Sequence, residues 1–171
     1  MNRILLTCIG TLATVSMAGT AFAAPRVAPP NTLFTATGPA TLSNPPISLS
    51  CVLKLEGKTG NPLATPPLPA GAPGGDIIRG TNTGPGLCSA VTIDPATFTV
   101  LTVSGSGTGT GVVNGLIVRL GGSAICTATA PTPFTFTNGT PSTINFSGLI
   151  PGTTCSVVTA LTPTPNLTVY P

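Results

Sequence analysis

The sequence predicts an all-β fold: an antiparallel β-sandwich or a partly closed barrel of short strands with two disulfides. Glycine and proline are abundant, 21 and 20 of the 171 residues, which favours frequent turns. Threonine and valine recur along the chain and favour pleated, half-buried surfaces. Hydrophobic residues make up 41% of the chain but aromatic residues only 4%. The core is therefore expected to consist mainly of valine, isoleucine, leucine and alanine.

Residues 1–23 have the organisation of a cleaved export signal. Arg3 supplies a positive charge, an apolar segment follows, and Ala21-Phe22-Ala23 forms an A-x-A cleavage site, so that Ala24 would begin the mature chain. A membrane anchor is the alternative, but the apolar stretch is short and polar residues interrupt it. We expect an exported protein, extracellular, at the cell surface or periplasmic, without a transmembrane segment once the signal is removed.

Four cysteines follow the predicted signal, and an even number in an exported chain predicts two disulfides. Three pairings are possible. We favour Cys51–Cys88 and Cys126–Cys155, because the residues around these pairs resemble two related halves. A zinc site is the alternative, but the sequence has no histidine and no C-x-x-C pair. No metal site is expected.

A Pro-rich extended leader is predicted at 24–32, and a single all-β domain at 33–171. The domain begins with a strand at 33–42, in which Pro39 cannot donate a ladder hydrogen bond, so we expect an edge or added strand. Alternate residues of this segment share one face: Phe34, Ala36, Gly38, Ala40 and Leu42.

The clearest half-buried strand is 47–56, in which apolar and polar residues alternate. The following segment, 57–87, is rich in proline and glycine. It is predicted to be a long loop tied back by Cys88, with one short strand around Ile77-Ile78. Strands near 89–94 and 97–103 come next.

Two Asn-Gly pairs predict hairpin turns. Asn114-Gly115 precedes a strand at 116–120, and Asn138-Gly139 lies between strands at 134–137 and 143–147. The segment 104–111 alternates glycine with serine or threonine, for which low complexity is the alternative interpretation. Strands at 155–161 and 166–170 follow. The sequence thus predicts about eight to ten short strands, a number typical of a sandwich or barrel.

Few residues are suited to catalysis. Without histidine a Ser-His-Asp triad is impossible. Glu56, Asp76 and Asp94 are the acids after the signal, and all three are expected at turns or strand ends rather than facing one another as a glycosidase pair. The basic residues are too scattered to neutralise a nucleic-acid backbone. We therefore expect a protein that is not an enzyme, with no cofactor and no nucleic-acid partner.

Several short segments resemble one known family. They are the signal end Ala21-Phe22-Ala23, residues 34–38 (FTATG) followed by 47–51 (ISLSC), 87–89 (LCS), and the closing pair 155–157 (CSV) and 165–169 (PNLTV). The chain resembles the secreted PraB-like activators of alkane oxidation. The resemblance implies a non-enzymatic exported protein associated with growth on hydrocarbons, surface-active material and biofilm matrix.

Three functions remain open from the sequence. The first is a matrix protein that self-associates, with segment 33–42 adding to a neighbour's sheet and building filaments; the alternative is that 33–42 is the first strand of its own domain. The second is a monomeric module that binds an apolar small molecule, such as an alkane, inside the fold. The third, a carbohydrate-binding surface, has little support because there is no tryptophan and Tyr170 is the only tyrosine.

Overall fold

The computed structural model describes residues 24–61 and 72–171. The predicted signal, including Ala21 and Ala23, lies outside the described residues, whereas Ala24 is the first of them and is exposed. The described residues form thirteen strands and one short 3₁₀ helix, η1 (Cys88–Ala90). The strands are β1 (Arg26–Ala28), β2 (Leu33–Asn44), β3 (Ile47–Thr59), β4 (Gly74–Thr83), β5 (Val91–Ile93), β6 (Ala96–Val103), β7 (Thr108–Asn114), β8 (Ile117–Leu120), β9 (Ser123–Thr127), β10 (Thr132–Thr137), β11 (Thr143–Leu149), β12 (Ser156–Thr164) and β13 (Thr168–Tyr170).

The all-β prediction is confirmed, and the sheet closes on itself rather than forming a sandwich. Eight strands follow one another around the barrel in the order β3, β2, β12, β11, β10, β7, β6 and β4, and a further pairing of β3 with β4 closes it. All of these pairings are antiparallel. Closure leaves no free edge among the eight strands. None of them therefore presents a row of unpaired backbone groups to a strand of another chain.

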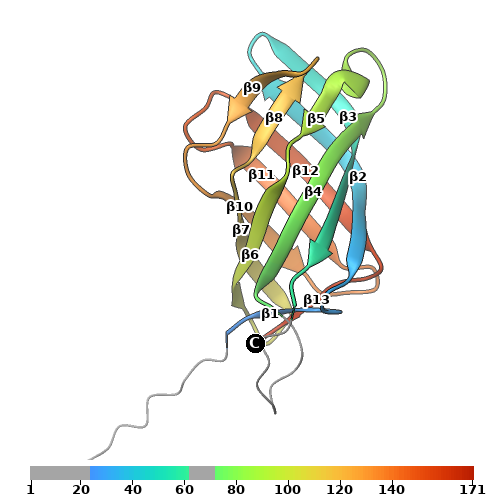
Figure 1. Cartoon of the computed structure of the whole chain (residues 1–171), viewed down its shortest axis with the longest axis vertical. Coiled ribbons are helices and arrows are strands. Elements are labelled where there is room, and N and C mark those ends of the chain that lie inside the picture. Colours follow the sequence, from blue (N-terminus) through green and yellow to red (C-terminus); the bar gives the residue numbers. More distant parts are fainter. Residues whose placement is uncertain (1–23, 62–71) are drawn as a thin grey trace, which may run out of the picture.

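The two ends of the barrel are closed in different ways (Figure 1). At the upper end, β5, β8 and β9 continue the sheet from β4, and η1 precedes β5 and contacts β3 and β4. At the lower end, β1 and β13 form a separate two-stranded sheet that crosses the opening.

The expectation that 33–42 is an edge or added strand is wrong for the single chain. This segment lies within β2, which pairs with β3 on one side and with β12 on the other. The β2–β12 ladder is interrupted opposite Gly38 and Pro39, where the Thr159 hydroxyl donates to the Pro39 carbonyl at 2.7 Å. A side-chain hydroxyl of β12 thus compensates for the irregularity at the proline.

The leader and the long loop are both more ordered than their composition predicts. Within 24–32, β1 pairs with β13, and Val27 is only 1% exposed, so the fold begins before residue 33. Within 57–87, β3 continues to Thr59 and the short strand expected around Ile77 is the ten-residue β4. The remainder of that predicted loop includes 62–71, which lie outside the described residues.

One predicted hairpin is present and the other is not. β10 and β11 pair around a loop at 138–142, as the second Asn-Gly pair predicts. Asn114-Gly115 does form a turn, with Gly115 at φ +74°, but β7 and β8 do not pair with each other. β8 instead leaves the barrel and pairs with β5 and β9.

The core contains more aromatic packing than the composition suggests. Phe34 and Phe98 pack edge to face with ring centroids 6.0 Å apart, and Phe98 continues to Phe134 at 6.5 Å and Phe134 to Phe146 at 5.6 Å. Such pairs add about 0.5–1.5 kcal/mol each beyond the area that they bury. This row of rings lines the lower part of the barrel interior.

Candidate functional site: an uncharged barrel face and an apolar interior

The two disulfides of the structure are Cys51–Cys88 and Cys126–Cys155, the pairing favoured from the sequence. Their Cα atoms are 5.6 and 6.1 Å apart. The first ties β3 to η1, and the second ties β9 to the residue before β12. Both are consistent with an oxidising, exported environment.

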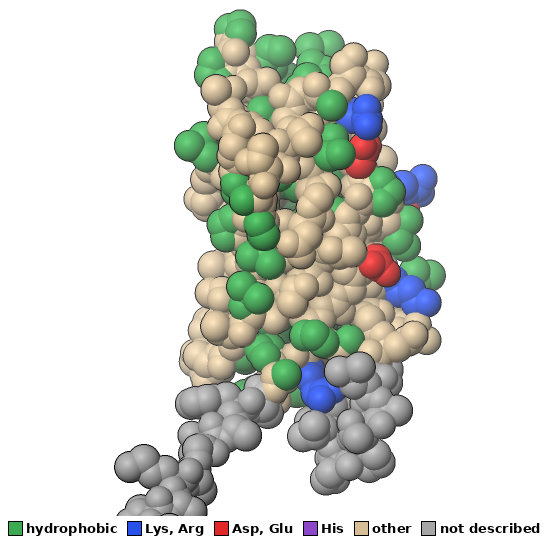
Figure 2. All heavy atoms as spheres, turned by 60° about the vertical axis from the view of Figure 1, so that its left-hand side comes forward, with side chains coloured by type: hydrophobic (Ala, Val, Ile, Leu, Met, Phe, Trp, Pro, Cys, Tyr) green, Lys and Arg blue, Asp and Glu red, His purple; other side chains and the backbone are tan. Residues whose placement is uncertain are grey.

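Apart from Arg26, which is buried on β1 at the lower end, the charged residues that the structure describes gather on one side of the barrel. Lys54, Glu56 and Lys58 lie on β3, Asp76 and Arg79 on β4, Arg119 on β8 and Asp94 in the β5–β6 turn. The six other barrel strands, β6, β7, β10, β11, β12 and β2, carry no charged residue and are neighbours in the barrel. Figure 2 shows the charged side chains along one side of the molecule and at its lower end, and a broad face with none.

Most of the acids are engaged in ion pairs. Glu56 contacts Arg79 at 2.6 Å and Lys54 at 3.0 Å. The hydrogen bond from Arg79 and then that from Lys54 lower the pKa of Glu56 to about 2. Asp94 accepts from Arg119 at 2.8 and 2.9 Å, and this hydrogen bond lowers the pKa of its carboxyl. Both carboxylates are therefore held ionised at neutral pH.

Threonine hydroxyls dominate the uncharged face. Thr102, Thr110, Thr135 and Asn145 form one row across four strands, as the ladder partners show. The hydroxyls of Thr102 and Thr110 bond to each other at 2.7 Å. Threonine presents a methyl group beside each hydroxyl, so this face is neutral and partly apolar. Bringing it to an apolar phase requires no burial of charge.

Exposed leucine and valine side chains add to this face. Among the described residues, seven large hydrophobic side chains are exposed, and four of them lie on its strands. They are Leu33, Leu101, Leu149 and Val158, each more than half exposed at 64%, 53%, 64% and 55%. Singly exposed apolar residues are ordinary. Their occurrence on a face without charges is the distinguishing feature.

The barrel interior contains two apolar cavities, of about 50 and 30 Å³. The upper cavity lies towards β5 and β8, where Leu116 and Val118 line it. The lower cavity lies among the phenylalanine rings and ends at Val27 and Val169, on the two strands that cross the lower opening.

The five residues predicted to mediate strand addition point mainly into this interior. Phe34, Ala36, Ala40 and Leu42 are buried in the core of their own barrel, and Gly38 is half-buried against β12. The structure thus shows the alternative, the first long strand of its own domain. Self-association of the protein stays a prediction.

Neither a metal centre nor a membrane helix occurs in the described part of the chain. No group of three metal-ligating side chains gathers in residues 24–61 and 72–171. No helix in the same residues is long and apolar enough to cross a membrane.

Comparison with models of known protein families gives a match that covers residues 1–171. The matching family is described as alkane oxidation protein activator, PraA/PraB-like. The chain belongs to this family. No curated protein and no solved structure matches the chain.

Membership of the PraA/PraB-like family confirms the resemblance drawn from the short motifs. The family description associates the chain with the activation of alkane oxidation. The uncharged face was not found from the sequence. Its residues come from 33–44, 96–114 and 132–164, and only the strand order makes them adjacent. The absence of charged residues from 120 onwards was the signal available in the sequence.

Proposed function

We propose that this protein is an exported, non-enzymatic accessory of alkane oxidation that contacts hydrophobic substrate through its uncharged face. The observation that carries the proposal is the division of the barrel into a charged side and a six-strand side without charges. The family description supplies the kind of substrate.

A two-sided barrel is suited to an alkane–water interface. Desolvating a charged group is far more costly than desolvating a hydroxyl that already has a hydrogen-bond partner. The side with Lys54, Glu56 and Arg79 would therefore remain in water, while the threonine-rich side would meet the oil. Adsorbed molecules would bring alkane and cell surface together without chemical change of the alkane.

The surroundings of the acids support a non-enzymatic role. Glu56 and Asp94 are each bound by an arginine that lowers the carboxyl pKa, which is unlike the raised pKa of a general acid. The chain also lacks histidine. These features favour binding or assembly over catalysis.

Interfacial tension of hexadecane drops in water tests the proposal directly. The wild-type protein is expected to lower the tension. A double variant, Thr41→Glu with Thr137→Glu, places two charges on the uncharged face at exposed positions of β2 and β10. It is expected to adsorb more weakly, because two carboxylates must then be desolvated.

The matched control places the same two charges on the charged side. Thr81→Glu with Thr83→Glu changes exposed residues of β4 and gives the same net charge. This control should adsorb like the wild type. The proposal would be refuted if the wild-type protein left the interfacial tension unchanged. It would also be refuted if both double variants lost adsorption to the same extent.

Self-association in a biofilm matrix is a second candidate, supported by the same face. A sheet face with few charges offers little repulsion between copies. Because the eight barrel strands are paired on both sides, we expect association through faces rather than through an added strand. Size-exclusion chromatography with negative-stain microscopy checks this, and a monomer at all concentrations, without filaments, would exclude it.

A further inference from the structure

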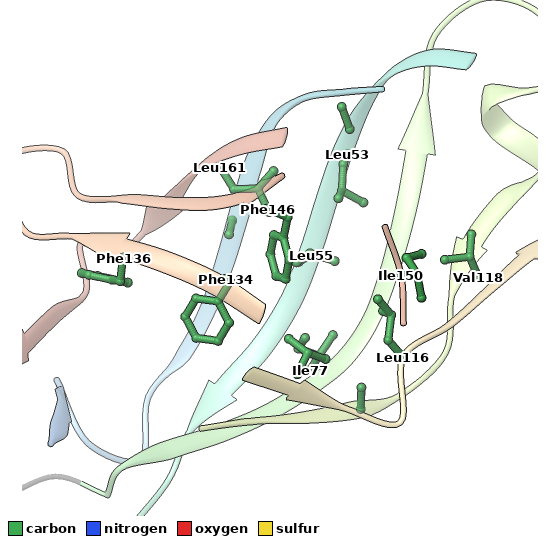
Figure 3. Packing of buried hydrophobic residues seen from close by; sticks show 14 of the residues in the cluster. Leu53, Leu55, Ile77, Leu116, Val118, Phe134, Phe136, Phe146, Ile150 and Leu161 are labelled. Atoms are coloured by element: carbon green, nitrogen blue, oxygen red, sulfur yellow. The ribbon is translucent and has the colours of Figure 1, made fainter. Parts of the chain in front are cut away.

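The two cavities of the barrel form one interrupted space. Their volumes are about 50 and 30 Å³, and each exceeds the roughly 10–15 Å³ that one water molecule needs. Four residues line both cavities: Leu55, Ile77, Val113 and Phe146. Figure 3 shows Phe146, Leu55 and Ile77 between the group of Phe134 and Phe136 and the group of Leu116, Val118 and Ile150. These shared residues are the partition between the cavities.

The walls offer little to a polar head group. The upper cavity has two polar lining residues, Asn82 and Thr159, and both already have partners. The Asn82 side-chain amide donates to the Val91 carbonyl at 3.2 Å, and the Thr159 hydroxyl donates to the Pro39 carbonyl at 2.7 Å. The lower cavity is lined by aliphatic and phenylalanine side chains. A carboxylate or hydroxyl placed there would lose its hydration without replacement, at a large cost in free energy.

We propose that the barrel interior binds an unsubstituted linear hydrocarbon, which spans both cavities when the Phe146 ring turns out of the partition. The choice of an alkane rests on the function proposed above, whereas the exclusion of a polar head group rests on the walls themselves. The smaller guest xenon tests the larger, upper cavity without this movement, because empty apolar cavities remain dry and accept apolar atoms.

The lower end is the entrance for such a ligand. The upper end is held by both disulfides, which tie η1 and β9 to the barrel. No disulfide holds the lower end: its contacts include three residue pairs between β1 and β13, a hydrogen bond from the Val27 amide to the Ala72 carbonyl at 3.0 Å, and two hydrogen bonds between the Asn138 side chain and the Val169 backbone. Val27, Leu167 and Val169 form the floor of the lower cavity. Parting β1 from β13 therefore opens this cavity.

Methyl NMR spectra of the disulfide-bonded mature protein test the proposal, with xenon, n-hexane and hexanoate as probes. Xenon should shift methyl signals of Leu116 and Val118 in the upper cavity, and hexane should shift these signals together with those of Val27 and Leu167 in the lower cavity. The exposed methyls of Leu101 and Val158 serve as reporters of outer-surface binding. Hexanoate should shift none of the interior signals.

Two variants distinguish the effect of opening the partition from the effect of enlarging one cavity. Phe146→Leu opens the partition and should tighten hexane binding roughly tenfold, the gain from burying about two more CH₂ groups. Phe136→Leu is the matched control, because Phe136 lines the lower cavity alone, and it should leave hexane affinity nearly unchanged.

Three results would overturn the inference: hexane shifts confined to Leu101 and Val158, an equal response to hexanoate and hexane, or no interior shift with xenon and hexane. None of these would alter the adsorption of the protein at a hexadecane drop. Conversely, a protein with shifted interior signals and no effect on interfacial tension would retain the internal site and lose the proposed surface function.

Discussion

Gly111 of β7 lies directly opposite Phe134 of β10, and a Cβ atom at Gly111 would collide with the phenylalanine ring. The same arrangement recurs around the barrel, where a glycine of the neighbouring strand faces a phenylalanine. The other ladder pairs are Phe34 with Gly57, Phe98 with Gly75, and Phe136 with Gly109. At Gly57, Gly75 and Gly111 a Cβ atom would meet the facing ring, so the missing side chains provide the space in which these rings fit a narrow barrel.

Replacing Gly111 by alanine should destabilise the protein. The added methyl group must displace the Phe134 ring or the Thr99 carbonyl, and overpacking of this kind costs about 1–3 kcal/mol. Urea unfolding measures the change. Gly105→Ala is the control, because a Cβ at Gly105 meets nothing within 4 Å, and it should change stability by less than about 0.5 kcal/mol. Equal effects of the two substitutions would contradict the role given to Gly111.

Removing either disulfide should cost a similar amount of stability. The bridges join residues 37 and 29 positions apart, for which the chain-entropy model gives about 3–4 kcal/mol each. Double replacement of Cys51 and Cys88, or of Cys126 and Cys155, by alanine should therefore lower the urea midpoint markedly. Peptide mapping by mass spectrometry checks the connectivity, and a peptide joining Cys51 to Cys126 or Cys155 would contradict it.

Stability should fall as the pH is lowered from about 4.5 to about 2. The folded-state pKa of Glu56 is lowered to about 2 from 4.5, so its stabilising contribution is complete above 4.5 and disappears as the carboxylate is protonated. Glu56→Gln should flatten this part of the curve of melting temperature against pH. Because the ion pair is exposed, 1 M salt should reduce the difference between the variant and the wild type. Parallel curves at low salt would show that Glu56 contributes nothing to the pH dependence.

Asn138 fastens the lower sheet to the barrel. Its side-chain amide donates to the Val169 carbonyl at 2.7 Å, and its side-chain oxygen accepts from the Val169 amide at 2.8 Å. Asn138→Ala removes both bonds, so hydrogen exchange at the Val169 amide should accelerate, with a loss of about 1–3 kcal/mol in stability. Asn145→Ala, on the outer row of the uncharged face, should leave that amide as protected as in the wild type. If the Val169 amide exchanged as slowly in Asn138→Ala as in the wild type, Asn138 would not attach the lower sheet to the barrel.

Sequence reasoning found the elements whose signals are local. Alternation along 47–56 predicted most of β3, and Asn138-Gly139 predicted the β10–β11 hairpin. Signals that depend on distant partners were misjudged. Asn114-Gly115 has the residues of a hairpin turn, but the partners of β8 are β5 and β9. The proline in β2 suggested an edge, whereas a threonine of β12, more than a hundred residues away, accommodates it.

The candidate site could not be derived from the sequence for the same reason. The alternation of glycine and threonine in 104–111 resembled low complexity. In the structure, Gly111 lies beneath the Phe134 ring, Gly109 is the ladder partner of Phe136, and Thr108 and Thr110 are exposed. Charges are sparse throughout the chain and most lie within 54–94, and the strand order then places six strands without charges side by side. Strand order, which no local pattern encodes, produces the uncharged face.

Hydroxyl-radical footprinting on hexadecane droplets tests the central claim most directly. Four exposed aliphatic side chains report on the two sides: Leu101 and Val158 on the uncharged face, and Val52 and Ile78 on the charged side. Adsorption should protect Leu101 and Val158 from oxidation while Val52 and Ile78 react as they do in solution. Protection of Val52 and Ile78 with Leu101 and Val158 still reactive, or equal protection of all four, would contradict the claim that this barrel meets alkane through its uncharged face.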